Sequence, residues 1–156
     1  MTARKTKSSN VVLLLSGPNL NLLGQREPQI YGKETLDDHA ATCRAEAEKH
    51  DLTLEHVQSN HEGEIIDAIH GARGRAAAII INAGAFSHYS WAIHDALVTF
   101  EGVKVELHLS NPYAREEWRH TSVIAPVVNG TIVGFKGSGY RLAALAVAEL
   151  LGVAKP

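Results

Sequence analysis

Three polar residues alternate with apolar ones in the run VELHLS, residues 105–110. This spacing places Glu106, His108 and Ser110 on one face of a β-strand. Histidine transfers protons readily near neutral pH, and a neighbouring carboxylate can orient its imidazole ring. For His108 alone, a core histidine bonded to a backbone carbonyl would be an alternative. Three polar side chains in a row favour an acid–base site.

A second candidate group lies in the segment GPNLNLLGQREPQIYG, residues 17–32, which places Arg26 and Tyr31 five residues apart. A guanidinium beside a phenol stabilises the phenolate and lowers the pKa of a tyrosine, which then becomes a general base. Tyr31 could instead be an ordinary turn residue before a glycine. The connection over residues 17–34 is 18 residues long, against 2–6 for most strand-to-helix loops, so we expect a mobile lid.

Other motifs in the sequence are weaker. The glycine-rich run GFKGSGY, residues 134–140, matches neither common phosphate-binding pattern, and we expect its glycines to serve a tight turn and close packing. The nine histidines include no HExxH motif, and His61 and His70 do not share a helical face, so no metal site is predicted. Arg115 and Arg119 either belong to a solvated helical turn or reach an anionic substrate.

The residues around these candidates predict an alternation of strands and helices. The expected strands span residues 11–16, 52–59, 76–82, 103–110 and 130–135. The expected helices span residues 35–50, with Thr35 as the N-cap, 63–73, 87–100 and 140–152. Nearly continuous apolar strands separated by helices are typical of parallel sheets covered on both faces. We therefore expect an α/β flavodoxin-like three-layer sandwich whose five-stranded parallel sheet has the order 2-1-3-4-5.

This fold predicts where the polar residues should gather. Ligands of such sheets bind beyond the carboxyl ends of the strands, near the switch point between the first and third strands. The first expected strand runs out into Asn19 and the third into Asn82, and the fourth contains Glu106 and His108. These polar endings favour a site at that edge of the sheet.

The composition is that of an ordinary globular protein, with 45% hydrophobic residues, 21% charged residues and a formal net charge of −2. It gives no reason to expect a nucleic-acid or membrane partner, and no run approaches the roughly 20 apolar residues that span a bilayer. We expect one catalytic domain over residues 11–156 after a flexible tail of residues 1–10. The single cysteine, Cys43, is expected to be a packing or surface residue rather than a nucleophile, and the expected location is cytoplasmic.

Four stretches of the sequence together resemble the type II 3-dehydroquinate dehydratases, also called type II dehydroquinases. They are GPNLNLLGQREPQIYG, INAGAFSHYSWAIHDAL, VELHLSNPYAREEWRHTS and GTIVGFKGSGYRLAAL, in the family's order and at its spacing between Val11 and Leu151. The resemblance implies a hydro-lyase that converts 3-dehydroquinate to 3-dehydroshikimate by a reversible anti elimination of water through an enolate. It also implies that no metal or cofactor takes part, and that the reaction belongs to the shikimate pathway of aromatic amino acid biosynthesis.

The resemblance implies a role for each candidate residue. Tyr31 is the expected base, with Arg26 stabilising its phenolate and closing the lid, and His108 is the expected general acid. Glu106 is expected to orient His108, and Asn19 to position a water that stabilises the enolate. The family's substrate-binding positions correspond to Asn82, His88, Ser110 and Arg119, with the backbone amides of Leu109 and Ser110 receiving the substrate carboxylate.

The resemblance further implies an oligomer. Asp95 matches a residue that reaches a neighbouring subunit's site, and the family assembles as a homododecamer of four trimers. This sequence differs from the family's usual pattern nearby, with Tyr89 and Trp91 as bulkier residues and His94 in place of an arginine.

The residues taken alone leave two other functions open. A flavodoxin-like module could bind a nucleotide or flavin through the glycine-rich turn near residue 137. A catalytically dead family member could serve only as an assembly subunit, although the presence of Arg26, Tyr31 and His108 argues against that function. The same dehydration also occurs in quinate breakdown, so the sequence does not decide the pathway.

Overall fold

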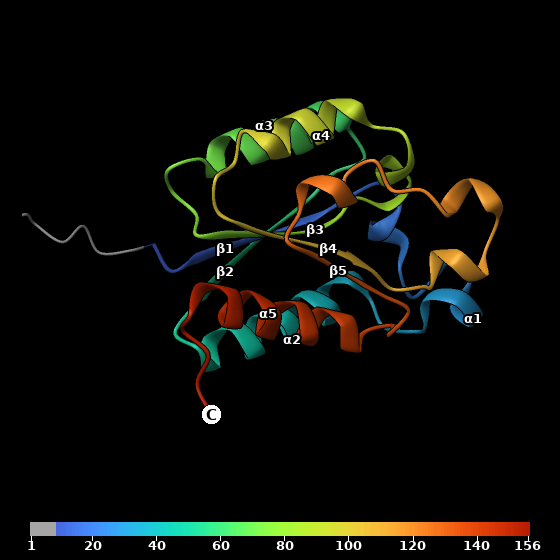
Figure 1. Ribbon diagram of the computed structural model, residues 1–156. Coiled ribbons are helices and arrows are strands. Elements are labelled where there is room, and N and C mark those ends of the chain that lie inside the picture. Colours follow the sequence, from blue (N-terminus) through green and yellow to red (C-terminus); the bar gives the residue numbers. More distant parts are fainter. Residues whose placement is uncertain (1–8) are drawn as a thin grey trace, which may run out of the picture.

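A parallel sheet lies between two layers of helices in the computed structural model, which describes residues 9–156 (Figure 1). The strands are β1 (Val11–Ser16), β2 (Thr53–Gln58), β3 (Ala78–Asn82), β4 (Val103–His108) and β5 (Gly130–Val133). The five strands lie in the order β2-β1-β3-β4-β5, and every neighbouring pair is parallel. The predicted flavodoxin-like fold and strand order are therefore confirmed.

Helices cover both faces of the sheet. They are α1 (Pro28–Tyr31), α2 (Leu36–Lys49), α3 (Glu62–Ala72), α4 (Trp91–Val98) and α5 (Ser138–Leu151). Figure 1 shows α3 and α4 on one face and α2 and α5 on the other. Leu14 and Ile80 pack in the core on the α2–α5 side, and Leu13 and Ile79 pack on the α3–α4 side. Because both faces are buried, successive residues of β1 and β3 are apolar, as the sequence shows.

Local capping sets where two of the helices begin. Thr35 caps α2 as predicted, because its hydroxyl accepts from Asp38 N while the Asp38 carboxylate accepts from Thr35 N. The helix expected over residues 87–100 is shorter, since Ser90 Oγ accepts from Ile93 N at 3.1 Å and starts α4 one residue later. The residues before this cap, Gly84–His88, form a separate 3-10 helix.

Two predicted strands end two residues earlier than expected. The strand expected over residues 130–135 stops at Val133, because Gly134 turns the chain with φ 88° in the left-handed region. The strand expected over residues 103–110 stops at His108. Ser110 therefore lies beyond the strand rather than on its face.

Several smaller predictions concern residues outside the site. Of the two places left open for Cys43, the core and the surface, the structure shows the core, and burial raises the pKa of its thiol to about 12. The expected tail over residues 1–10 lies outside the described residues, apart from Ser9 and Asn10. Within residues 9–156, no helix has the length and apolar character needed to cross a membrane.

Candidate active site

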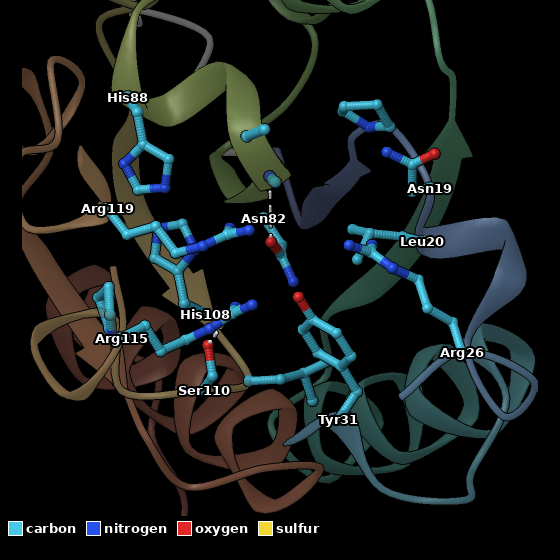
Figure 2. Close-up of a pocket in the computed structure, with 15 residues that line it drawn as sticks. Asn19, Leu20, Arg26, Tyr31, Asn82, His88, His108, Ser110, Arg115 and Arg119 are labelled. Carbon is cyan, nitrogen blue, oxygen red and sulfur yellow. Dashed lines mark hydrogen bonds between the residues drawn. The ribbon is translucent and has the colours of Figure 1, made fainter. Parts of the chain in front are cut away.

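A pocket lies at the carboxyl ends of β1, β3 and β4, the edge of the sheet predicted from the strand endings (Figure 2). Its lining residues are Pro18, Asn19, Leu20, Arg26, Tyr31, Asn82, Gly84, Ala85, His88, His108, Leu109, Ser110, Pro112, Arg115 and Arg119. Figure 2 shows the side chains of Arg26 and Asn19 on one side and those of Arg115, Arg119 and His108 on the other. The sheet order brings these segments together, because β1 lies beside β3 and β3 beside β4.

One side of the pocket contains a histidine held by a buried carboxylate. His108 Nε2 lies 2.8 Å from Glu106 Oε1, and Glu106 is fully buried. Ser122 Oγ donates to Glu106 Oε1 at 2.7 Å, and Thr131 Oγ1 donates to Glu106 Oε2 at 3.4 Å. An ionised carboxylate only accepts hydrogen bonds, so this arrangement places a proton on Nε2 of His108. Nδ1 is then the ring nitrogen left to exchange a proton with a ligand.

A tyrosine lies between two guanidinium groups on another side of the pocket. Tyr31 is buried at the end of α1. The guanidinium carbons of Arg26 and Arg115 lie 5.0 Å and 5.2 Å from the centre of its ring. Arg115 also donates from Nη1 to Ser110 Oγ at 3.2 Å. Two guanidinium groups from different segments of the chain therefore contact the ring of this one tyrosine.

His88 and Arg119 lie close to His108. His88 Nδ1 is 2.8 Å from the carbonyl oxygen of Thr121, which can only accept, so Nδ1 carries a proton. Burial lowers the pKa of His88, which favours the neutral ring. The rings of His88 and His108 lie 6.3 Å apart. Arg119 stacks on Trp118 and donates from Nε to Glu116 Oε2 at 2.7 Å, which holds its guanidinium near the pocket.

Asn82 is held from two directions at the end of β3. Its Oδ1 accepts from Gly84 N at 3.3 Å, and its Nδ2 donates to Tyr140 Oη at 3.3 Å. Tyr140 is fully buried, and the ring of His39 stacks on it with centroids 4.9 Å apart. Burial raises the pKa of Tyr140, so its hydroxyl remains protonated and can accept this bond. The amide of Asn82 therefore has a fixed orientation in the pocket.

The structure brings most of the sequence-predicted site residues together and leaves one apart. Asn19, Arg26, Tyr31, Asn82, His88, His108, Leu109, Ser110 and Arg119 all line the pocket, and Glu106 lies directly behind His108. Asp95 does not line it and lies exposed on α4. Its expected contact with a neighbouring subunit remains a prediction.

Sequence reasoning missed three residues that support the site, namely Ser122, Thr131 and Tyr140. Arg115 was considered only as one of two arginines that could reach an anionic substrate, and its contact with Tyr31 was not predicted. Thr131 was detectable in part, because the register of β5 beside β4 pairs it with Glu106. Ser122 lies outside the helices and strands, and no spacing rule connects it with Glu106.

The weaker motifs take structural roles. A Cβ on Gly137 would lie 2.9 Å from His39 Cε1, and one on Gly139 would lie 2.8 Å from Leu107 Cδ1. The glycines of residues 134–140 thus allow a turn and close packing, as predicted, and none of them lines the pocket. Among residues 9–156, no group of three His, Cys, Asp or Glu side chains has a geometry that could hold a metal ion.

Known proteins similar to this chain share both its sequence and its fold. A family model described as "Dehydroquinase class II" matches residues 10–148. The 3-dehydroquinate dehydratase of Halalkalibacterium halodurans is 52% identical over 138 residues, which cover 88% of this chain and 95% of that protein. The catabolic 3-dehydroquinase 1 of Neosartorya fischeri is 54% identical over 132 residues, covering 85% of this chain and 88% of that protein.

Solved structures agree with the sequence comparisons. The crystal structure of type II dehydroquinase from Propionibacterium acnes matches with a TM-score of 0.86 and 44% identity, covering 90% of this chain and 97% of that one. The family model matches most of the chain, and the relatives are 52% and 54% identical to it. These two findings establish the family. The chain belongs to the class II dehydroquinase family.

Proposed function

We propose that this protein is a 3-dehydroquinate dehydratase that removes water from 3-dehydroquinate to form 3-dehydroshikimate, reversibly and through an enolate. The observation that carries the proposal is one pocket that holds Tyr31 between two guanidinium groups and His108 against a buried carboxylate. Elimination beside a ketone needs a base for the C–H proton, a group that stabilises the enolate and an acid for the departing hydroxyl. The pocket offers a candidate for each.

Tyr31 is the proposed base. Its phenolate, stabilised by Arg26 and Arg115, would take the proton next to the ketone. Arg115 thus joins Arg26 in a role that the sequence resemblance gave to Arg26 alone. The negative charge then passes from the phenolate to the enolate oxygen, where an amide or an amide-held water stabilises it. Asn19 is the proposed residue for this step, because its side chain lines the pocket.

His108 is the proposed acid. Glu106 fixes the ring through Nε2, and the proton for the leaving hydroxyl comes from Nδ1. The proposed substrate contacts come from Asn82, His88, Ser110 and Arg119, with the backbone amides of Leu109 and Ser110 receiving the carboxylate. Two arginines near Ser110 supply the positive charge that an anionic substrate needs.

The test is to mix the purified protein with 3-dehydroquinate and follow the ultraviolet absorbance of the conjugated enone product. Because the proposed groups transfer protons without a metal or cofactor, a chelator should leave the rate unchanged. A rate abolished by the chelator would contradict this mechanism. A folded protein that forms no enone would refute the proposed function and leave the fold unaffected.

The assembly and setting of the enzyme are further parts of the proposal. We propose a homo-oligomer, a dodecamer of four trimers, in which Asp95 contacts the site of a neighbouring subunit. Its exposure on α4 leaves it available for such a contact. Asp95→Ala should therefore raise KM or reduce the oligomer size measured by light scattering; no change in either would contradict this role. We also propose a cytoplasmic enzyme of aromatic amino acid biosynthesis, although one similar protein is named as catabolic.

A further inference from the structure

The turn after β1 holds Asn19 in a backbone conformation that few residues adopt. Asn19 has φ 67° and ψ −4°, in the left-handed region where asparagine is tolerated better than most non-glycine residues. Its side chain lines the pocket and makes no capping bond to the 3-10 helix that follows. The backbone of Asn19 therefore determines where this amide group lies in the pocket.

Two side chains from the end of β2 hold this turn. Asn60 Oδ1 accepts from Asn19 N at 3.0 Å. Gln58 Nε2 donates to the same Asn60 oxygen at 3.2 Å and to the carbonyl oxygen of Gly17 at 3.2 Å. These three bonds connect both ends of the Gly17–Asn19 turn to one short segment, and neither Gln58 nor Asn60 lines the pocket.

The segments on both sides of the turn are themselves fixed. Ser59, which is buried between Gln58 and Asn60, donates from its N to the carbonyl oxygen of Ser16 at 3.0 Å. On the opposite side, a Cβ on Gly17 would lie only 2.4 Å from the carbonyl oxygen of Ala83, so the turn packs directly on the end of β3. Since β1 lies between β2 and β3, the Gly17–Asn19 turn that follows it is held by contacts with the segments at the ends of both neighbouring strands.

We infer that Asn60, supported by Gln58, is a positioning residue that acts on the reaction through Asn19. The Oδ1 of Asn60 holds the amide N–H of Asn19 and so keeps the backbone left-handed and the side chain directed to the enolate. The inference rests on the proposed function, because that function gives Asn19 its role. Asn60 uses only an acceptor oxygen for these contacts, so a carboxylate at this position can replace it.

The test is a double-mutant cycle on kcat and KM. Asn19→Ala should lower kcat by roughly 10²-fold, the usual effect of losing one group that stabilises an oxyanion. Asn60→Ala should lower kcat roughly five- to tenfold with little change in KM, the effect of one exposed hydrogen bond. In the Asn19→Ala background, Asn60→Ala should cost nothing further, because residues that act through one another are not additive. Asn60→Asp should restore most of the wild-type kcat.

Asn129→Ala is the matched control. Asn129 is exposed, and its Oδ1 accepts from Lys104 N at 2.8 Å. It thus makes the same kind of bond as Asn60, a side-chain oxygen accepting from a backbone N–H, but next to β5, the outer strand on the opposite side of the sheet from β2. This variant should leave kcat and KM unchanged. Loss of kcat in Asn129→Ala equal to that in Asn60→Ala would show a general effect on stability and overturn the inference.

Hydrogen–deuterium exchange of the peptide around Asn19 gives a readout that does not depend on activity. Asn60→Ala should speed exchange of the Asn19 amide, and Asn60→Asp should leave it slow. Exchange at the Asn19 amide that is unchanged in Asn60→Ala would overturn the positioning role. The role would also be overturned if Asn60→Ala lowered kcat by the same factor in the Asn19→Ala background as in the wild-type protein. A nearly wild-type kcat in Asn19→Ala would instead refute the role proposed for Asn19 and, with it, the inference.

Discussion

Replacing Glu106 by Gln tests the acid side of the pocket, because the change keeps the shape of the side chain and removes its charge. Glu106 is fully buried, and its Oε1 contacts His108 Nε2 at 2.8 Å. A hydrogen bond to a charged group contributes about 1.5–3 kcal/mol, and 1.36 kcal/mol corresponds to about a tenfold change in rate. Glu106→Gln should therefore lower kcat about 10- to 150-fold while KM stays within about twofold.

The partners of this carboxylate provide a graded comparison. Ser122 Oγ donates to Glu106 at 2.7 Å, whereas Thr131 Oγ1 donates at 3.4 Å, near the limit for a hydrogen bond. We expect Ser122→Ala to lower kcat about fivefold and Thr131→Val less than about twofold. The order of effects should be Glu106→Gln, then Ser122→Ala, then Thr131→Val.

The assay for this series is steady-state formation of the enone from 3-dehydroquinate, with thermal melting to show that each variant is folded. A Glu106→Gln enzyme within about threefold of the wild-type kcat would refute the role of the carboxylate. A larger loss of kcat in Thr131→Val than in Ser122→Ala would show that the lengths of these hydrogen bonds do not determine how strongly each donor supports Glu106 and His108.

Three further substitutions test other parts of the structure. Tyr31→Phe should lower kcat by roughly 10²-fold or more with substrate binding largely kept, whereas the exposed Tyr113→Phe should have no effect; a nearly wild-type rate for Tyr31→Phe would exclude it as the base. Tyr140→Phe leaves the Nδ2 of Asn82 without its partner, so KM should rise several-fold and the melting temperature should fall. Burial lowers the pKa of His39 below 6.5, so the unfolded chain binds more protons under weakly acidic conditions, and the free energy of unfolding should decrease as the pH falls below about 6.5. Denaturant titrations should show a smaller decrease for His39→Phe, and an equal decrease would contradict this account.

The fold was predictable because its signals are local and repeated. Apolar runs such as Val11–Ser16 and Ala78–Asn82 are buried on both faces, and a run of this kind predicts a central parallel strand. Element ends were predicted less well. The start of α4 depends on a single hydroxyl, that of Ser90, which competes with the helical signal of the residues before it.

The site was predictable where one element supplies it. Glu106 and His108 lie on one strand, so their alternation alone predicted that they would face the same side. Other contacts of the site come from distant segments, and only the folded chain shows that Ser122 reaches Glu106 and that Tyr140 reaches Asn82. For Arg115 and Arg119, the sequence left open a solvated helical turn or contact with an anionic substrate. In the structure Arg115 follows one short 3-10 helix, Arg119 ends the next, and both line the pocket.

The two sides of the pocket are built by different means, and this affects how each responds to mutation. His108 is carried by a buried strand, and its carboxylate partner is held by donors from two further segments. Tyr31 is carried by a four-residue helix in a long connection, and Arg26 from the same connection contacts its ring. Arg115 joins the two sides, since it contacts both the Tyr31 ring and the Ser110 hydroxyl beyond β4. The proposed base, Tyr31, is therefore placed correctly only when the connection packs against the rim of the sheet, and Arg115 is the contact that links this packing to the side of the proposed acid, His108.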